Sequence, residues 1–247
     1  MKKVIAVIPA RYESSRFPGK PLALIAGKPM IQRVYEQVKK VDGIAEVLVA
    51  TDDERIAKCV EAFGGIYAMT GECSCGTERV YEAIKDYDCD IVLNVQGDEP
   101  YIKPQQLEQL GACFNDPSVE LATLVKRVIG KDELMNPNSP KVIVDKNGDA
   151  IYFSRTPIPY SRDIEVTDEY VNSTPFFRHI GLYGYRVETL ARICAMPQGF
   201  LEKTEKLEQL RWIENGLKIR VAETEFQTHA VDTEEDLAFI NSKYDWD

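Results

Sequence analysis

The beginning of the chain reads VIAVIPARYESSRFPGKPL over residues 4–22. Its first five residues are apolar, which is the pattern of a strand buried on both faces. The loop that follows carries Arg11, Arg16 and Lys20, whose fixed charges can bind phosphate oxygens. Gly19 lets the backbone come close to a ligand. Nucleotide phosphates bind after the first strand of many α/β sheets, so this segment predicts a nucleotide-binding α/β fold.

The loop does not match the P-loop of many ATPases. A Walker A pattern requires Gly five residues before Gly19 and Ser or Thr after the lysine. Those positions hold Ser14 and Pro21. Pro21 also has no N–H to donate to a phosphate, and it interrupts the helix that would follow. The alternative interpretation is a basic loop that is merely solvated.

Composition narrows the classes of partner. The 247 residues are 44% hydrophobic and 28% charged, which is typical of a globular protein of one large domain or two small ones. A net charge of −10 argues against nucleic acid and against an anionic membrane as partners, because both require a basic surface. Cations clustered in one loop of an acidic chain instead predict a small anionic ligand.

The sequence also favours a cytoplasmic location. Residues 1–3 lead directly into the first strand, and no apolar run approaches the length of a membrane span. The six cysteines form no C-x-x-C pair, and only two histidines are available for a zinc site. We therefore expect reduced thiols and a cytoplasmic protein.

Strand and helix patterns alternate in the first half of the chain. This alternation predicts a mostly parallel Rossmann-like sheet with helices on both faces. The expected strands are 4–8, 47–50, 66–69 and 91–95, and the expected helices are 30–40, 54–63 and one starting at 77.

The second half predicts a smaller, mixed portion. In the expected strand 179–185, the residues His179, Tyr183 and Tyr185 share one face. A polar, proline-bearing excursion is expected over 156–175. The other expected elements are strands at 121–128, 142–144, 151–153, 219–222 and 229–231, a hairpin turn at 146–149, a helix over 205–214 and a closing helix capped by 233–236.

Two aspartates are candidate magnesium ligands. Asp98 follows the expected strand 91–95 at its carboxyl end, where open α/β sheets bind ligands. The alternative is a turn-forming aspartate that bonds its own backbone. Asp232 lies between the expected strand 229–231 and the closing helix, so an N-cap is its alternative role.

Two other acidic pairs are weaker candidates. Asp88-Cys89-Asp90 has the D-x-D spelling of nucleotide-sugar transferases, but it precedes its strand and so lies at the wrong end of the sheet. Asp52-Asp53 lies at a correct strand end, and capping of the next helix explains it.

Eight segments, in order along nearly the whole chain, resemble the 3-deoxy-manno-octulosonate cytidylyltransferases, the CMP-Kdo synthetase family. They are 11–21, 50–53, 76–79, 94–100, 152–155, 178–186, 205–211 and 231–236. Sialic-acid cytidylyltransferases share the Pro-Gly-Lys loop, but theirs is richer in glycine. The resemblance implies a homodimer that makes CMP-Kdo and diphosphate from CTP and Kdo, with Mg²⁺, for lipopolysaccharide assembly. It implies one nucleotidyltransferase domain over 1–247, with a nucleotide-binding half over about 1–130 and a sugar-acid-binding and dimerisation half over about 131–247.

The resemblance also assigns site residues. It implies that Lys20, Arg11 and Asp98 are catalytic, and that Asp98 and Asp232 bind Mg²⁺. The implied substrate-binding residues are Ser15, Arg16, Arg79, Gln96, Arg155, His179, Tyr183, Glu208 and Gln209. Chemically, Arg155 suits a bidentate grip on the sugar carboxylate, and the loop cations suit the leaving diphosphate.

One departure from the family concerns Cys73-Ser74-Cys75, which replaces a more polar triplet before the segment 76–79. Cysteine is a weak hydrogen-bonding partner, so the base contacts and the sugar preference stay open. Alternatives are a cytidylyltransferase for another keto-deoxy sugar acid, such as 8-amino-Kdo or a sialic-acid-like sugar, and a non-catalytic nucleotide-binding regulatory protein.

Overall fold

The computed structural model describes residues 2–14, 16–227 and 229–243. Its contacts divide the chain into two compact units that are not consecutive halves. Unit 1 comprises Met1–Glu108, Arg186–Cys194 and Gln227–Asp247, and unit 2 comprises Gln109–Tyr185 and Ala195–Phe226. The expectation that they act as one nucleotidyltransferase domain stays a prediction.

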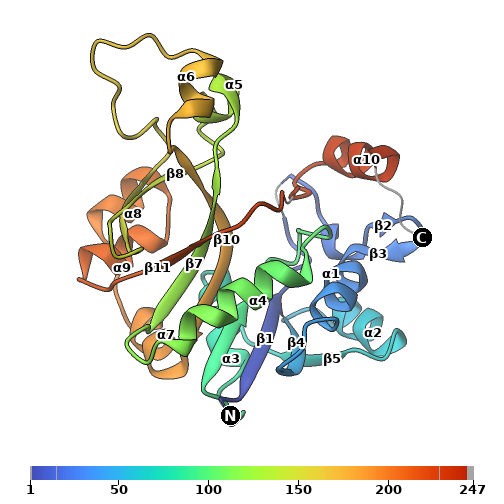
Figure 1. Ribbon diagram of the computed structural model, residues 1–247. Helices are drawn as coiled ribbons and strands as arrows, with labels where there is room; N and C mark the ends of the chain where they lie inside the picture. Colours follow the sequence, from blue (N-terminus) through green and yellow to red (C-terminus); the bar gives the residue numbers. More distant parts are fainter. Residues whose placement is uncertain (1, 15, 228, 244–247) are drawn as a thin grey trace. The chain divides into compact units, whose positions relative to one another are not determined.

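Unit 1 is built on four parallel strands, as the sequence predicted. They are β1 (Val4–Pro9), β4 (Ile44–Thr51), β5 (Ile66–Met69) and β6 (Ile91–Asn94), in the order β6-β1-β4-β5 (Figure 1). β1 is paired on both edges, with Val7 opposite Leu48 on one side and Asn94 on the other. Its apolar residues 5–8 have no exposed surface, which explains their unbroken hydrophobic run.

The helices of unit 1 follow from this strand order. They are α1 (Met30–Val38), α2 (Glu54–Ala62), α3 (Gly76–Ala83), α7 (Val187–Cys194) and α10 (Glu234–Lys243). The chain proceeds from β1 outward to β4 and β5, and then returns to β6 on the far side of β1. Right-handed crossovers therefore place α3 on the face opposite α1 and α2. The strand order reverses beside β1, and ligands of such sheets bind at the carboxyl ends of the strands at that point.

A small apolar cluster joins the loop after β1 to the end of the chain. It contains Ile25, Met30, Val231 and Ile240, with Phe17 packed against it. The loop continues through the 3₁₀ helix η1 (Lys20–Leu22) and the short strands β2 (Leu24–Ile25) and β3 (Lys28–Pro29). Two segments about 210 residues apart in sequence are thereby held together.

Unit 2 contains a mixed set of strands, as expected. They are β11 (Arg220–Glu223), β7 (Leu121–Arg127), β10 (Phe177–Arg186), β8 (Lys141–Val144) and β9 (Ala150–Ser154). β7 pairs with β11 in parallel and with β10 antiparallel, and β8 pairs antiparallel with β10 and β9. The segment before β7 forms α4 (Pro104–Ala112) and η2 (Cys113–Asn115).

The structure corrects three sequence expectations. The single helix expected over 205–214 is two helices, α8 (Phe200–Glu205) and α9 (Gln209–Glu214), because Lys206 adopts a left-handed conformation with φ 53°. The excursion over 156–175 contains a helix, α6 (Asp168–Ser173), which packs beside α5 (Gly130–Met135) (Figure 1). Residues 229–231 are not a strand, although Val231 N donates to Asp98 O at 2.9 Å.

Within the described ranges, no helix is long and apolar enough to cross a membrane.

We expect a buried ion pair to stabilise the α8–α9 region. The Arg211 guanidinium donates to both oxygens of Glu202, at 2.8 and 2.9 Å, and both side chains are under 10% exposed. Glu202→Gln should lower the free energy of unfolding by about 2 kcal/mol, because a buried cation loses its main counter-charge while Glu208 stays 3.6 Å away. Urea denaturation measures the change. Glu54→Gln is the control. Because the pair of Glu54 with Lys58 is exposed, this substitution should change the free energy of unfolding by less than about 0.5 kcal/mol. Equal effects would contradict the expectation.

Candidate active site

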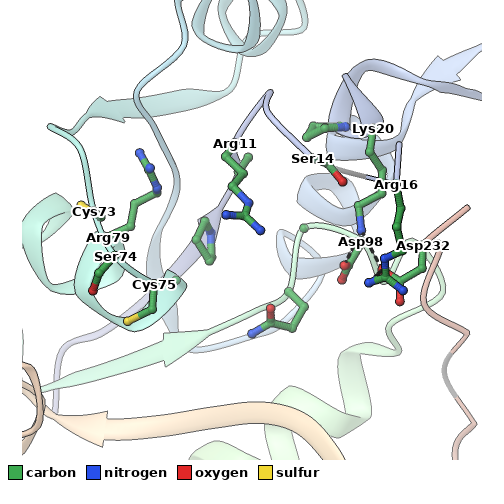
Figure 2. A pocket seen from close by; sticks show the side chains of 16 residues that line it. Arg11, Ser14, Arg16, Lys20, Cys73, Ser74, Cys75, Arg79, Asp98 and Asp232 are labelled. Carbon is green, nitrogen blue, oxygen red and sulfur yellow. Dashed lines mark hydrogen bonds and ion pairs between the residues drawn. The ribbon is translucent and has the colours of Figure 1, made fainter. Parts of the chain in front are cut away.

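A pocket of about 440 Å³ lies in unit 1, at the carboxyl ends of β1 and β6. Its size is ordinary for a small-molecule site. Seven of the predicted site residues line it: Arg11, Arg16, Lys20, Arg79, Gln96, Asp98 and Asp232 (Figure 2). Ser15, also predicted, lies outside the described residues. The sequence interpretation of the cationic loop as a ligand site, rather than a solvated loop, is therefore supported by its geometry.

A tight turn fixes the backbone at Lys20. Gly19 has φ 72° and ψ 12°, and Lys20 N donates to Phe17 O at 3.3 Å, which defines a type II turn with Pro18 at its second position. A β-carbon at Gly19 would approach the Tyr12 ring to 3.1 Å in addition to the unfavourable φ. The turn formed by Pro18 and Gly19 thus fixes the backbone position of Lys20 near the end of β1.

Asp98 is positioned by a close approach of two backbone segments. A β-carbon on Gly97 would lie 3.0 Å from Pro9 O, tighter than most such contacts, so glycine lets the turn after β6 pass this near to β1 without a shift of the backbone. The carbonyl of Asp98 accepts a hydrogen bond from Val231 N at 2.9 Å. The same contact brings the next residue, Asp232, to the pocket.

Asp232 is not the cap of the last helix. Thr233 Oγ1 accepts from Asp236 N at 3.2 Å, while Asp236 Oδ2 accepts from the backbone N–H groups of Asp232 and Thr233 at 2.9 and 3.0 Å. This reciprocal arrangement is a capping box, as expected for 233–236. It leaves the carboxylate of Asp232 available to the pocket, so the N-cap alternative for this residue is wrong.

Lysine and arginine hold the two aspartates together. Lys20 Nζ lies 2.6 Å from Asp98 Oδ2 and 3.3 Å from Asp232 Oδ1, and an Arg16 nitrogen lies 3.2 Å from the same Asp232 oxygen (Figure 2). The Lys20 side chain is 15% exposed and Arg16 is 64% exposed. Lys20 is therefore the more enclosed cation, and the turn-forming alternative for Asp98 does not describe its side chain.

Arg79 is held by two residues that follow neighbouring strands. Its guanidinium donates to Asp52 Oδ2 and to Thr70 Oγ1, both at 2.6 Å, and its side chain is 6% exposed. Helix capping, expected for the pair Asp52-Asp53, is confirmed for Asp53, which accepts the capping hydrogen bond from Arg55 N at 2.8 Å, whereas Asp52 binds Arg79 instead. Asp52 is a positioning residue for Arg79.

The Cys73-Ser74-Cys75 segment lines the pocket near Arg79 (Figure 2). Burial, with Glu82 3.6 Å from its sulfur, raises the pKa of the Cys73 thiol to about 11. The thiol is protonated at neutral pH and is a poor nucleophile. Ser74 donates from its N–H and its hydroxyl to Glu78, each at 2.7 Å. These two hydrogen bonds hold the loop against helix α3, which follows it.

Arg11 and Gln96 complete the pocket wall. Arg11 is exposed and lies between the Arg79 group and the Lys20 group in Figure 2. Gln96 is half-buried and lies two residues after the end of β6, and its amide can offer both a donor and an acceptor to a ligand.

In unit 2, His179 and Tyr183 belong to an aromatic cluster. The His179 ring lies 5.2 Å from the rings of Phe153 and Tyr183, and Trp212 contacts the Tyr183 ring edge-on at 5.0 Å. Tyr183 and Tyr185 stack at 6.0 Å, which supports the expected shared face although the β10 register shifts between 180 and 183.

His179 is a neutral group. Desolvation, with a smaller effect from Arg178, lowers its pKa to about 3. Thr123 Oγ1 lies 3.0 Å from His179 Nε2 and donates its only hydrogen to Leu182 O at 2.7 Å. Ile180 O, at 3.2 Å, is a second acceptor for this hydrogen. In the tautomer that fits a hydroxyl donating to either carbonyl, Nε2–H donates to Thr123 and Nδ1 is a hydrogen-bond acceptor.

Several buried polar atoms of unit 2, two of them in this cluster, have no hydrogen-bonding partner among the described residues. They are Tyr183 Oη, Gln209 Nε2 and Trp212 Nε1, on side chains of residues 7%, 4% and 1% exposed. Burial also raises the pKa of Tyr183 well above its ordinary value, so its hydroxyl is a donor. A polar ligand that satisfied these atoms would recover about 1–3 kcal/mol for each. Trp212 is a residue that the sequence analysis missed, since an apolar ring at helical spacing carries no distinguishing signal.

Arg155 was expected to bind the sugar carboxylate, but its side chain binds backbone carbonyls of the chain itself. Its guanidinium donates to three backbone carbonyls, those of Glu205, Pro137 and Lys206, at 2.6, 2.9 and 3.2 Å. Its own N–H donates to Glu205 Oε2 at 2.9 Å. These bonds attach β9 to the break between α8 and α9, so the side chain acts here as a structural tie. Glu208, at the start of α9, lies 3.6 Å from Arg211.

Comparison with known proteins assigns the class. Residues 5–219 match the Cytidylyltransferase family model, so the chain belongs to the cytidylyltransferases, which are nucleotidyltransferases. Within this family it groups with the 3-deoxy-manno-octulosonate cytidylyltransferases. A relative of that name from Parabacteroides distasonis is 52% identical over 98% of this chain and 100% of its own length. Another, from Phocaeicola vulgatus, is 51% identical over 96% and 95%.

Structural comparison agrees. A CMP:2-keto-3-deoxy-manno-octonic acid synthetase solved in complex with CTP has a TM-score of 0.89 and 42% identity, covering 97% of both chains. The fold predicted from the sequence, an α/β nucleotidyltransferase with a mostly parallel sheet, is confirmed.

We expect Asp52 to affect nucleotide affinity through Arg79. Asp52→Ala removes a 2.6 Å charged hydrogen bond and should weaken CTP binding about fivefold, because Arg79 then samples other rotamers. Isothermal titration calorimetry measures the affinity. The control is Asp53→Ala, which removes the α2 cap and should cost about 1 kcal/mol of stability without changing CTP affinity. Equal CTP affinities in the two variants would contradict the role given to Asp52.

The low pKa of His179 predicts that the stability of the protein depends on pH. As pH falls from about 6.5 towards 3, the unfolded chain takes up a proton at this residue while the folded chain does not. The free energy of unfolding should therefore decrease with acidity over this window. Urea denaturation between pH 7 and pH 5 should show a smaller loss for His179→Gln, which cannot be protonated, than for the unmodified protein. Parallel losses would show that His179 titrates normally.

Proposed function

We propose that this protein transfers CMP from CTP to the anomeric hydroxyl of 3-deoxy-D-manno-octulosonate (Kdo), releasing diphosphate. The observation that carries the proposal is the group of Lys20, Asp98 and Asp232 at the ends of β1 and β6, in a pocket also lined by Arg11 and Arg79. The names of the full-length relatives identify the nucleotide and the sugar acid. The product would serve lipopolysaccharide assembly.

The residues of the pocket fit a magnesium ion. An ammonium group already lies between carboxylate oxygens of Asp98 and Asp232, so this space suits a cation. Hard oxygen donors are the ligands that Mg²⁺ prefers, and it is commonly held by one or two carboxylates together with waters and substrate phosphates. No group of three or more His, Cys, Asp or Glu side chains that could hold a metal ion occurs in the part of the chain that the structure describes. When bound, the ion would polarise the phosphoryl group and orient the two substrates.

The chain's own residues supply the remaining electrostatics. The oxygen of the sugar hydroxyl attacks the α-phosphorus and its proton is released to solvent, while the bond to the bridging oxygen of diphosphate breaks and negative charge moves onto the diphosphate. Lys20, Arg11 and Arg16 come from one loop and would bind that charge, together with Ser15. Arg79 and Gln96, which line the same pocket, would bind the nucleotide. No side-chain nucleophile is required.

The aromatic cluster of unit 2 is the proposed acceptor site. His179 Nδ1 would offer an acceptor, while Tyr183 and Gln209 offer donors that have no partner among the described residues. Glu208 precedes Gln209 in sequence. A polyhydroxylated acid presents both donors and acceptors, so it suits this set. Arg155 would act by fixing the α8–α9 break that carries Glu208 and Gln209, and we propose this in place of a free carboxylate clamp.

We further propose a cytoplasmic homodimer. The compartment follows from the use of CTP and from a cysteine pattern without disulfide or zinc spacing. Large apolar side chains that are about half exposed or more in unit 2 suit a subunit interface, in particular Ile129, Met135, Tyr160 and Ile164. Light scattering after size-exclusion chromatography measures the oligomeric state.

The test is diphosphate release from each nucleoside triphosphate, with and without Kdo, 8-amino-Kdo or sialic acid. We expect turnover only with CTP and a Kdo-type acid. Asp98→Asn should lower kcat by at least about a hundredfold with its fold intact. Glu36→Gln is the control, because Glu36 pairs with Lys28 away from the pocket. Preference for 8-amino-Kdo or sialic acid would support the alternative acceptors, and no release with any combination would support a non-catalytic nucleotide-binding protein.

A further inference from the structure

The Lys20 ammonium group occupies the space between the two candidate metal ligands. Lys20 Nζ contacts one oxygen of each of the two candidate metal ligands, Asp98 and Asp232, at 2.6 and 3.3 Å. The Lys20 side chain is 15% exposed, so these contacts are partly shielded from solvent. Figure 2 shows the ammonium directed at both carboxylates.

We propose that Lys20 stands in for the divalent cation, bridging Asp98 and Asp232 until the metal and the nucleotide arrive together and then moving onto the triphosphate. The inference rests on the proposed function, since it takes a metal-bound nucleoside triphosphate as the ligand. It adds that the metal site of the free protein is closed by an internal cation.

The reason is competition for the same oxygens. A divalent ion can use Asp98 Oδ2 and Asp232 Oδ1 only after the ammonium has left them, because two cations at this spacing repel. Two carboxylates alone also leave most of the coordination sphere of Mg²⁺ to water. The metal alone must therefore displace an ion pair without gaining a full set of ligands.

The triphosphate removes this obstacle. Its oxygens offer new acceptors to Lys20 and further ligands to the metal, so both cations gain partners when it binds. Each ligand then raises the affinity of the other by the same factor. In the free protein, Lys20 also prevents the two aspartates from repelling each other, which keeps the site assembled.

The local structure permits this exchange. The type II turn over 17–20 fixes the lysine backbone, while the flexible four-carbon side chain can redirect its ammonium group. Arg16 cannot substitute for it, because Arg16 contacts Asp232 but not Asp98 and is 64% exposed.

The experiment measures metal binding without turnover. Free Mn²⁺ is titrated by electron paramagnetic resonance against the full-length protein, without nucleotide and then with CTP but no sugar. Without nucleotide, Lys20→Met should bind Mn²⁺ at least about fivefold more tightly than the unmodified protein, because the competing ion pair is gone. With CTP, the affinity of the unmodified protein should rise steeply, and that of Lys20→Met should rise less.

Two variants serve as controls. Lys28→Met removes another ion-paired lysine of unit 1, 2.8 Å from Glu36 and outside the pocket lining, and should bind Mn²⁺ like the unmodified protein. Lys20→Arg keeps a cation at the position and should also keep the weak affinity. Thermal melts provide a second measurement, in which Mn²⁺ alone should raise the Tm of Lys20→Met more than that of the unmodified protein.

The outcomes separate the two proposals. An unchanged or weaker Mn²⁺ affinity in folded Lys20→Met, while the unmodified protein binds Mn²⁺ with CTP, would overturn the stand-in role and leave the proposed function intact. If CTP changes Mn²⁺ affinity in none of the proteins, the proposed function fails. Tighter Mn²⁺ binding by Lys20→Met would then still support competition between the lysine and the metal, and would overturn the exchange onto a triphosphate.

Discussion

The parallel pairing of β1 on both of its edges is the constraint on which the site depends. Val7 lies opposite Leu48 of β4 and Asn94 of β6, so β1 and β6 end at the same edge of the sheet. The cationic loop and the turn that carries Asp98 therefore leave the sheet side by side. Gly97 allows them to approach until the position of its missing β-carbon is 3.0 Å from Pro9 O. A side chain there would force the two segments, and the charges that they carry, apart.

Local sequence patterns predicted the nucleotide-binding half of the fold well. Short apolar runs between helical patterns located β1, β4 and β6 to within a few residues, because buried parallel strands depend little on distant context. The edge strand β5, which is mostly exposed, was also placed correctly. The errors occur where tertiary contacts override local preference. Lys206 breaks a helix that the pattern continued, and its carbonyl accepts a hydrogen bond from Arg155, which is 51 residues away in sequence. The α6 helix follows a proline-bearing stretch but buries Val171 completely in a small cluster of its own.

Candidate site residues could be predicted from the sequence where no local structural role explained the residue. Lys20 and Asp98 follow buried strands and have no local partners that would explain them. Asp52 was missed because helix capping explained it adequately, and nothing in the local sequence singled out Thr70. Their shared contact with Arg79 exists only once β4 and β5 are side by side. The role expected for Arg155 as a carboxylate clamp stays a prediction, although its donors are used within the chain. A guanidinium can bind a carboxylate, but the same donors satisfy carbonyls at the end of a helix equally well, and sequence cannot distinguish these uses.

Charge balance in the pocket explains why the ligand and its counter-ion belong together. The two aspartates offset Lys20 and Arg16, and Arg79 is offset by Asp52, so Arg11 contributes the remaining positive charge. A triphosphate carries far more negative charge than one arginine can offset, and the chain as a whole is acidic. A divalent ion that displaced the lysine would add its own charge and also release the lysine for the phosphates. In the free pocket, the two carboxylates offset the positive charge of Lys20. In the complex they would hold a divalent ion instead, while Lys20 stays in the pocket on the phosphates, so the total positive charge facing the triphosphate would be greater.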